Sequence, residues 1–429
     1  MHKAHRLFLL VAIACLLSSA AHAQAGVPNH IAFAGAPQYA QADLLAISGL
    51  KPHTSLNADA MNAAARLLAD TGFFSNITFS YDGFALTYHL TPAPASNFLP
   101  ARYDNFVWWT PDDIATELHR RHPLFTTLVP QSGTMQDALI ADLTSMLAAK
   151  GVTATVNATP GASVPNSMAV DCVHFAVASP PVHVRTIQFT DLSPELVAKL
   201  EGVRNANQGQ DYLESDTPAA VKLSATDAIQ DEGYLDVTVD NFHRSAPVVE
   251  PAQVSVDLSL SVHPGERYRI AQVDWPGSTL LSPADFKKLS RLKVGEAPSI
   301  TALRQTRMSL ANAYTLHGYM AAKTNIEPKK DTAARLVSYI VTVTPGVQYA
   351  FHSMTLTGVN DQQREDFMHA WKMQTGMPYN GAYILTFLHD NSGVLRSLDG
   401  YSLQWKQMVN DNNHTVDVQL TLKKGGPLQ

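Results

Sequence analysis

The sequence is poor in cysteine. Its 429 residues include only two, Cys15 and Cys172. Cys15 lies in an N-terminal segment with the features of an export signal, so an exported chain would retain Cys172 alone. A single cysteine cannot form an intramolecular disulfide, and stability must then come from apolar packing. Cys172 lies in the strand-like run Val-Asp-Cys-Val-His-Phe, where we expect a buried apolar role.

Long apolar runs and clustered basic residues are also missing. Beyond residue 17 no apolar run approaches the length of about 18 residues that a membrane-spanning helix needs. Charged residues make up 16% of the chain, and the formal net charge is -6. Binding to phosphate backbones needs clustered Lys and Arg, so we expect no nucleic-acid partner.

The first 23 residues predict a signal peptide. A basic start at residues 2–6 precedes an apolar run at 7–17, and Ala21-His22-Ala23 forms an A-x-A cleavage site. This pattern predicts export and a mature chain that begins near Gln24. Lipidation at Cys15 is the alternative, and the segment leaves both processing routes open.

Catalytic signatures are absent as well. The sequence contains no G-x-S-x-G elbow, P-loop or G-x-G-x-x-G motif. The His-Arg-Arg-His run at 119–122 lacks the carboxylates of a zinc motif and predicts a solvated helix surface. Asp112 and Asp113 follow Thr110-Pro111, where acidic side chains complement the start of a helix. We therefore predict no enzymatic activity, no metal and no cofactor.

The sequence contains five copies of one pattern of predicted helices and strands. In residues 303–346 a helix ends at Gly318, and two strands follow before a Thr-Pro-Gly stop. Glycine suits that helix end because it adopts the left-handed conformation without steric cost. The order strand, helix, helix, strand, strand recurs, which is the signature of a repeat architecture. We name the copies modules 1 to 5: residues 27–92, 97–181, 182–264, 265–346 and 347–424.

Helix starts and turn residues mark the modules. Asn57, Ser193-Pro194 and Ser282-Pro283 are predicted to open helices. Module 2 is the most divergent, with a predicted strand at 106–109 that would place Trp108 and Trp109 on opposite faces. The exposed member of this pair is a candidate contact residue. The predicted structural motif positions are Gly35, Gly49, Gly72, Phe73, Gly233, Tyr234, Gly318, Tyr319, Gly358 and Gly376.

These motifs resemble the POTRA domain, a module of the periplasmic arms of bacterial outer-membrane protein assembly factors. The resemblance is strongest in module 1, through Ile31-x-Phe33-x-Gly35 and the run Thr71-Gly72-Phe73-Phe74. It implies an α+β fold of tandem β-α-α-β-β domains, each with two helices over a three-stranded mixed sheet. Assembly factors continue into a membrane barrel, whereas this sequence stops soon after module 5, so we expect an arm without a barrel.

The resemblance implies a non-catalytic periplasmic scaffold, or a chaperone-like docking arm, peripheral to the outer membrane. Its expected partners are unfolded outer-membrane clients, a β-barrel protein or a lipoprotein. An open sheet edge can take up an extended peptide through backbone hydrogen bonds, so we expect binding by β-augmentation. The alternative is a structural component of a secretion or cell-envelope complex with one fixed partner.

Overall fold

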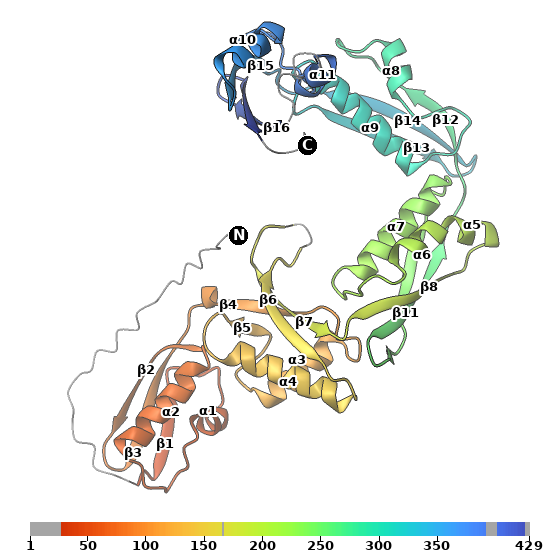
Figure 1. Cartoon of the computed structure of the whole chain (residues 1–429). Coiled ribbons are helices and arrows are strands. Elements are labelled where there is room, and N and C mark those ends of the chain that lie inside the picture. Colours follow the sequence, from red (N-terminus) through yellow and green to blue (C-terminus); the bar gives the residue numbers. More distant parts are fainter. Residues whose placement is uncertain (1–26, 165–166, 392–400, 425–429) are drawn as a thin grey trace. The chain divides into compact units, whose positions relative to one another are not determined.

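The computed structural model describes residues 27–164, 167–391 and 401–424 (Figure 1). The predicted signal peptide, with Cys15, lies outside these residues. The chain divides into two compact units. Unit 1 comprises Met1–Thr186, Gln208–Ala219 and Arg244–Leu258, and unit 2 comprises Ile187–Asn207, Ala220–His243 and Ser259–Gln429.

Module 1 has the predicted β-α-α-β-β order. Its elements are β1 (His30–Ala34), α1 (Gln41–Ser48), α2 (Ala58–Asp70), β2 (Phe74–Tyr81) and β3 (Ala85–Pro92). The sheet order is β1-β3-β2, with β1 parallel and β2 antiparallel to β3. The Asn57 side chain accepts a hydrogen bond from the Ala60 amide, as expected for the cap of α2. Alternate strand residues such as Phe33 and Leu86 are buried, which gives the sheet one apolar face.

Modules 4 and 5 repeat this topology. Module 4 contains β12 (Arg269–Asp274), α8 (Pro283–Leu289), α9 (Ile300–Thr315), β13 (Lys323–Asp331) and β14 (Leu336–Thr344). Module 5 contains β15 (Ala350–Thr357), α10 (Asp361–Ala370), α11 (Tyr383–Asp390), β16 (Tyr401–Asn410) and β17 (Thr415–Lys424). Their sheets have the orders β12-β14-β13 and β15-β17-β16. Ser282 and Asp285 form the capping box that starts α8.

Modules 2 and 3 keep the α+β plan but have four-stranded sheets instead of the expected three. Module 2 contains β4 (Phe98–Tyr103), α3 (Pro111–Arg121), β5 (Leu128–Pro130), α4 (Met135–Ala149), β6 (Thr155–Gly161) and β7 (Cys172–Ser179). Module 3 contains β8 (Val182–Thr190), α5 (Pro194–Lys199), α6 (Glu201–Asn207), α7 (Thr217–Asp231), β9 (Thr238–Arg244), β10 (Val248–Val249) and β11 (Val254–His263). The sheet orders are β5-β4-β7-β6 and β10-β11-β8, with β9 also paired to β11. The extra strands β5 and β10 are short, which explains why the sequence pattern did not indicate them.

The predicted strand at 106–109 is wrong. The first strand of module 2 is β4, and residues 106–109 form a turn that leads into α3. The Asn105 side chain explains the early end of β4. Its amide nitrogen donates to the Val177 carbonyl at 2.9 Å, and its oxygen accepts from the Val177 amide at 2.7 Å. The Asn105 side chain thus takes the place of the next backbone hydrogen bonds between β4 and β7. The aromatic residues that follow Asn105 therefore leave the sheet.

Glycines at helix ends contact the following module. Gly72 has a φ of +80°, and a Cβ there would lie 2.1 Å from the Ser132 carbonyl oxygen of module 2. At Gly318 a Cβ would lie 2.5 Å from the Tyr349 oxygen of module 5. The corresponding Gly151 of module 2 has a φ of +78° but nothing within 4 Å. The joints after modules 1 and 4 therefore depend on a backbone approach that only glycine permits.

We predict that Gly72→Ala destabilises modules 1 and 2 by about 3 kcal/mol or more, because strained backbone and a clash with Ser132 add together. Gly151→Ala is the matched control, since it carries the same backbone strain of about 1 kcal/mol without the clash. Hydrogen exchange at the amides of β2 and β5 measures the difference. Equal exchange in the two variants would contradict a packed joint at Gly72.

Candidate strand-docking site

The outer strands of the sheets differ in how well they are protected against pairing. In module 4, the nine-residue outer strand β13 carries five charged side chains, those of Lys323, Glu327, Lys329, Lys330 and Asp331. It also contains a proline, and in module 2 the outer strand β6 contains another. Charges and proline on an edge strand discourage pairing with another chain. These two edges are therefore poor docking sites.

The outer strand β16 of module 5 lacks this protection. It has ten residues, no proline and a single charged side chain, that of Lys406. Trp405, Met408 and Val409 are 39%, 42% and 46% exposed. One side of β16 pairs with β17 over its full length, and within the described residues no strand pairs with the other side. A long apolar edge of this kind is a template for an additional strand.

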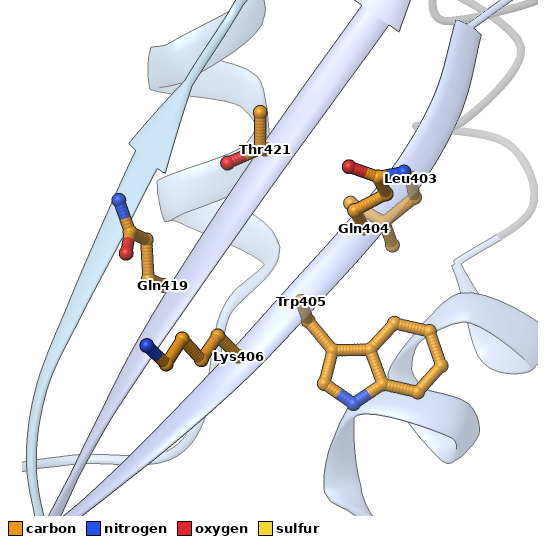
Figure 2. Close-up of a pocket in the computed structure, with 6 residues that line it drawn as sticks. All are labelled: Leu403, Gln404, Trp405, Lys406, Gln419 and Thr421. Carbon is orange, nitrogen blue, oxygen red and sulfur yellow. The ribbon is translucent and has the colours of Figure 1, made fainter. Parts of the chain in front are cut away.

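The two faces of β16 differ in chemistry. Leu403 is buried in the module 5 core, and the alternation along a strand places Trp405 on the same side and Gln404 and Lys406 on the other. Figure 2 shows the Trp405 indole projecting away from β17, while Lys406 and Gln419 lie over the sheet. An open hollow of about 640 Å³ is lined by Leu403, Gln404, Trp405, Lys406, Gln419 and Thr421. Along residues 403–406 an added strand would meet apolar groups on one face and amide, hydroxyl and ammonium groups on the other, and Met408 adds an apolar group to the second face.

The central strand β17 is fixed to β15 by a carboxylate. Asp417 accepts hydrogen bonds from the Ser353 hydroxyl and from Nδ1 of His352, the latter at 2.7 Å. The hydrogen bond from Ser353, followed by that from His352, lowers the pKa of Asp417. The contact lies at a register shift between Phe351 and Ser353, where the backbone ladder is interrupted. Asp417 thus supports the sheet on which the β16 edge depends.

The predicted motif positions are spread over the modules and do not come together in one site. Every glycine among them has a positive φ. Gly35 and Gly358 follow the first strands of modules 1 and 5 and lie against the carbonyls of Leu90 and Leu422. Phe73 is buried, whereas Tyr234 and Tyr319 are half-buried. Their roles as structural positions stay a prediction.

Trp108 and Trp109 are both half-buried and pack against the core that modules 1 and 2 share. Their ring centroids are 6.1 Å apart. The Lys150 ammonium lies 5.7 Å from the Trp109 ring centroid, a cation–π geometry. The two side chains thus lie near each other in a turn and do not point to opposite faces of a sheet. A contact role for either remains a prediction.

One arrangement that sequence reasoning missed aligns Cys172, His174 and Asp104. His174 Nδ1 lies 2.9 Å from Asp104 Oδ1, and Nε2 lies 3.1 Å from Cys172 Sγ. The order resembles that of a thiol nucleophile with its base, but Cys172 is fully buried, and burial raises the pKa of its thiol. A reactive thiol needs access and a lowered pKa, so this cluster is better explained by packing. Asp104 and His174 are 70 positions apart, and no local pattern could have indicated the contact.

The other acidic and histidine residues that the sequence analysis considered for catalysis or metal binding form structural contacts. Asp113 forms a capping box with Thr110, and Arg121 and His122 both contact Asp142, at 3.0 and 2.6 Å. His119 Nδ1 lies 2.6 Å from the Phe125 carbonyl oxygen. In the part of the chain that the structure describes, no group of three or more His, Cys, Asp or Glu side chains is placed to hold a metal ion. The helices described are also too short or too polar to cross a membrane.

Sheet order and helix placement define the class: a protein built from small β-α-α-β-β modules. Residues 268–346 match the family model of the POTRA domain, described as a surface antigen variable number repeat. Module 4 thus matches the POTRA family model, in agreement with the resemblance that the sequence indicated.

The chain is also similar to part of one curated protein and to several solved structures. A "Putative outer membrane protein assembly factor" of Treponema pallidum (strain Nichols) is 26% identical over 168 residues, which cover 39% of this chain and 20% of that protein. The chain therefore spans about a fifth of that relative. Among solved structures, POTRA3-5 of Haemophilus influenzae BamA has a TM-score of 0.41 at 15% identity and covers 57% of this chain and 96% of that one. POTRA1-3 of Omp85 from Anabaena has a TM-score of 0.22 at 17% identity, with coverage of 57% and 96%.

We predict that Asp417→Asn weakens module 5 by about 1 kcal/mol at pH 7. The pKa of Asp417 is lowered in the folded state, so its contribution is complete above the unfolded value of about 3.9 and is lost as pH falls below it. Hydrogen exchange of β15 and β17, compared between wild type and variant at each pH, should show a difference at pH 7 that decreases as pH falls through the lowered folded-state pKa of Asp417. A difference that persists in acid would contradict this role of the carboxylate.

Proposed function

We propose that this chain is a non-catalytic scaffold or chaperone-like docking arm that acts in outer-membrane protein assembly at the periplasmic face of the outer membrane. The single observation that carries the proposal is the β16 edge: ten unprotected residues with three exposed apolar side chains. The POTRA match and the likeness to an assembly factor support the setting. Its partners are extended segments of unfolded clients, or the edge of a β-barrel or lipoprotein partner.

Backbone pairing explains why such an arm suits many clients. The hydrogen-bonding groups of an edge strand are the same in every polypeptide, so β-augmentation selects for an extended conformation rather than for one sequence. Any preference of the edge for particular client side chains then comes from the residues on the two faces of the outer strand. At β16, Trp405 and Lys406 would favour a segment whose residues alternate between apolar and polar.

A probe peptide tests the edge directly. We expect a nine-residue peptide that alternates Val and Thr to bind with protection of alternate β16 amides from exchange. Trp405→Lys should weaken binding about tenfold, because an apolar contact is lost and charge is added to the edge. Leu385→Lys in α11 is the matched control, since this leucine is more than half exposed in the same module. Binding that is unchanged in Trp405→Lys, or protection outside β16, would contradict the proposal.

Fractionation of cells that express the chain tests its setting. We expect it to be recovered with the periplasm and the outer membrane, together with several different clients after cross-linking from β16. Recovery in the cytoplasm would contradict the proposed setting. One fixed partner in constant ratio would instead support a structural component of a secretion or cell-envelope complex.

A further inference from the structure

Three carboxylates cross the joint between modules 3 and 4, which lies within unit 2. They belong to Asp227, Asp231 and Asp236 of module 3, and each accepts hydrogen bonds from module 4. The joint between modules 1 and 2 instead contains one continuous apolar core. We call the three side chains the joint carboxylates.

Asp231 caps a helix of the next module. Its carboxylate accepts hydrogen bonds from the Thr301 amide and the Thr301 hydroxyl, both at 2.8 Å, and from the Ser299 hydroxyl at 2.7 Å. Ser299 is the N-cap of α9, so the negative charge lies where the helix dipole is positive. Protonation of Asp231 would remove this charge and weaken the carboxylate as an acceptor.

Two ion pairs add to the cap. Arg304 of α9 donates two hydrogen bonds to the Asp227 carboxylate, at 2.6 and 2.8 Å. Lys330 of β13 and the Tyr268 hydroxyl both donate to Asp236, the hydroxyl at 2.7 Å. Because charge-assisted and bidentate hydrogen bonds are strong and directional, these contacts fix the direction in which module 4 leaves module 3.

Apolar contact at this joint is small. In the part of unit 2 that the structure describes, Leu235 is the only module 3 residue that packs against the module 4 core. The backbones meet at Gly233, whose carbonyl accepts a hydrogen bond from the Tyr268 amide at 2.9 Å. Both contacts lie in residues 233–235, a short segment about which module 4 can turn if the carboxylates release it.

The joint carboxylates favour their charged form. Burial opposes the ionisation of Asp231, but the hydrogen bonds that it accepts at the start of α9 outweigh this effect and lower its pKa. Hydrogen bonds from Lys330 and then from Tyr268 lower the pKa of Asp236. The contribution of both groups is therefore complete above the unfolded value of about 3.9, and it is lost as pH falls through the lowered folded-state values.

The other charged groups around the joint pair mainly within their own module. Lys199 contacts Glu232 at 2.7 Å in module 3, and Arg335 contacts Glu266 at 2.9 Å in module 4. Arg267 donates to the backbone carbonyl of Glu232, which does not titrate. Within the described residues, neither glutamate side chain bonds to the opposite module. Protonation therefore acts on the joint through the three aspartates.

We propose that the joint carboxylates form an acid-sensitive latch, which holds module 4 against module 3 while they are charged and lets module 4 turn about residues 233–235 once they are protonated. Module 5 would turn with module 4, because Met320 of module 4 packs against the module 5 core. Opening of the latch would thus redirect the β16 edge relative to module 3. The latch does not depend on what β16 binds, so the two proposals fail separately.

The test measures the distance between two nitroxide labels across the joint, in the chain from Gln24 onward. Labels are attached at Leu223→Cys on α7 and Met308→Cys on α9, both more than half exposed, and the buried Cys172 is replaced by Ala. We expect a narrow distance distribution at pH 7 that broadens at least about twofold as pH falls through the lowered pKa values of the aspartates. Protection of β14 amides from hydrogen exchange, measured in parallel, confirms that module 4 stays folded.

Substitutions at pH 7 test the carboxylates without acid. Asparagine reproduces the shape of a protonated aspartate, so the triple variant Asp227→Asn, Asp231→Asn and Asp236→Asn should give the broad distribution already at pH 7. It should change no further in acid. Arg304→Gln leaves α7 intact and removes one ion pair, so it should broaden the distribution less than the triple variant does.

The matched control removes three exposed carboxylates of modules 1 and 2, in the triple variant Asp59→Asn, Asp112→Asn and Asp137→Asn. It changes the net charge equally and should keep the narrow distribution at pH 7. A narrow distribution in the joint triple variant would overturn the proposal. Broadening of the joint triple variant in acid would also overturn it, because groups other than the joint carboxylates would then control the opening.

Discussion

Close backbone contact at the module joints is the constraint on which the rest of the structure depends. At Gly233 and Gly318 the glycine carbonyl accepts a hydrogen bond from the amide of Tyr268 and of Tyr349, at 2.9 and 2.8 Å. Each tyrosine directly precedes the first strand of the next module. The end of the second helix of one module therefore determines where the sheet of the following module begins. A side chain on either glycine would push these strands away, which is why the joint and the sheet register depend on the same residue.

Sheets of one topology carry different chemistry at their edges. β13 and β16 occupy the same place in modules 4 and 5, yet the first is charged and interrupted by Pro328, and the second is apolar and continuous. The fold therefore supplies an edge in every module, and side chains decide which edge is open. Function in such a protein is a property of individual strands, in keeping with the general separation of fold from function.

Much of the fold was predictable because its signals are local. Caps such as Asn57 and Ser282, and glycines at helix ends, act within a few residues of their own position. The strand predicted at 106–109 failed because Asn105 pairs with Val177, a contact across 72 positions that overrides the strand preference of an aromatic run. The protection of the β13 edge could not be predicted either, since it requires knowing which strands are outermost. Element order follows from the sequence, whereas edges and grooves emerge only in three dimensions.

The joint glycines also bear on how chains of this kind can gain or lose modules. Tyr268 and Tyr349 each follow a Pro-Gly pair, in the runs at 264–268 and 345–349, and each completes the helix end of the module before it. A module cut away at its linker would thus leave its neighbour with an unpaired glycine carbonyl and an uncovered loop.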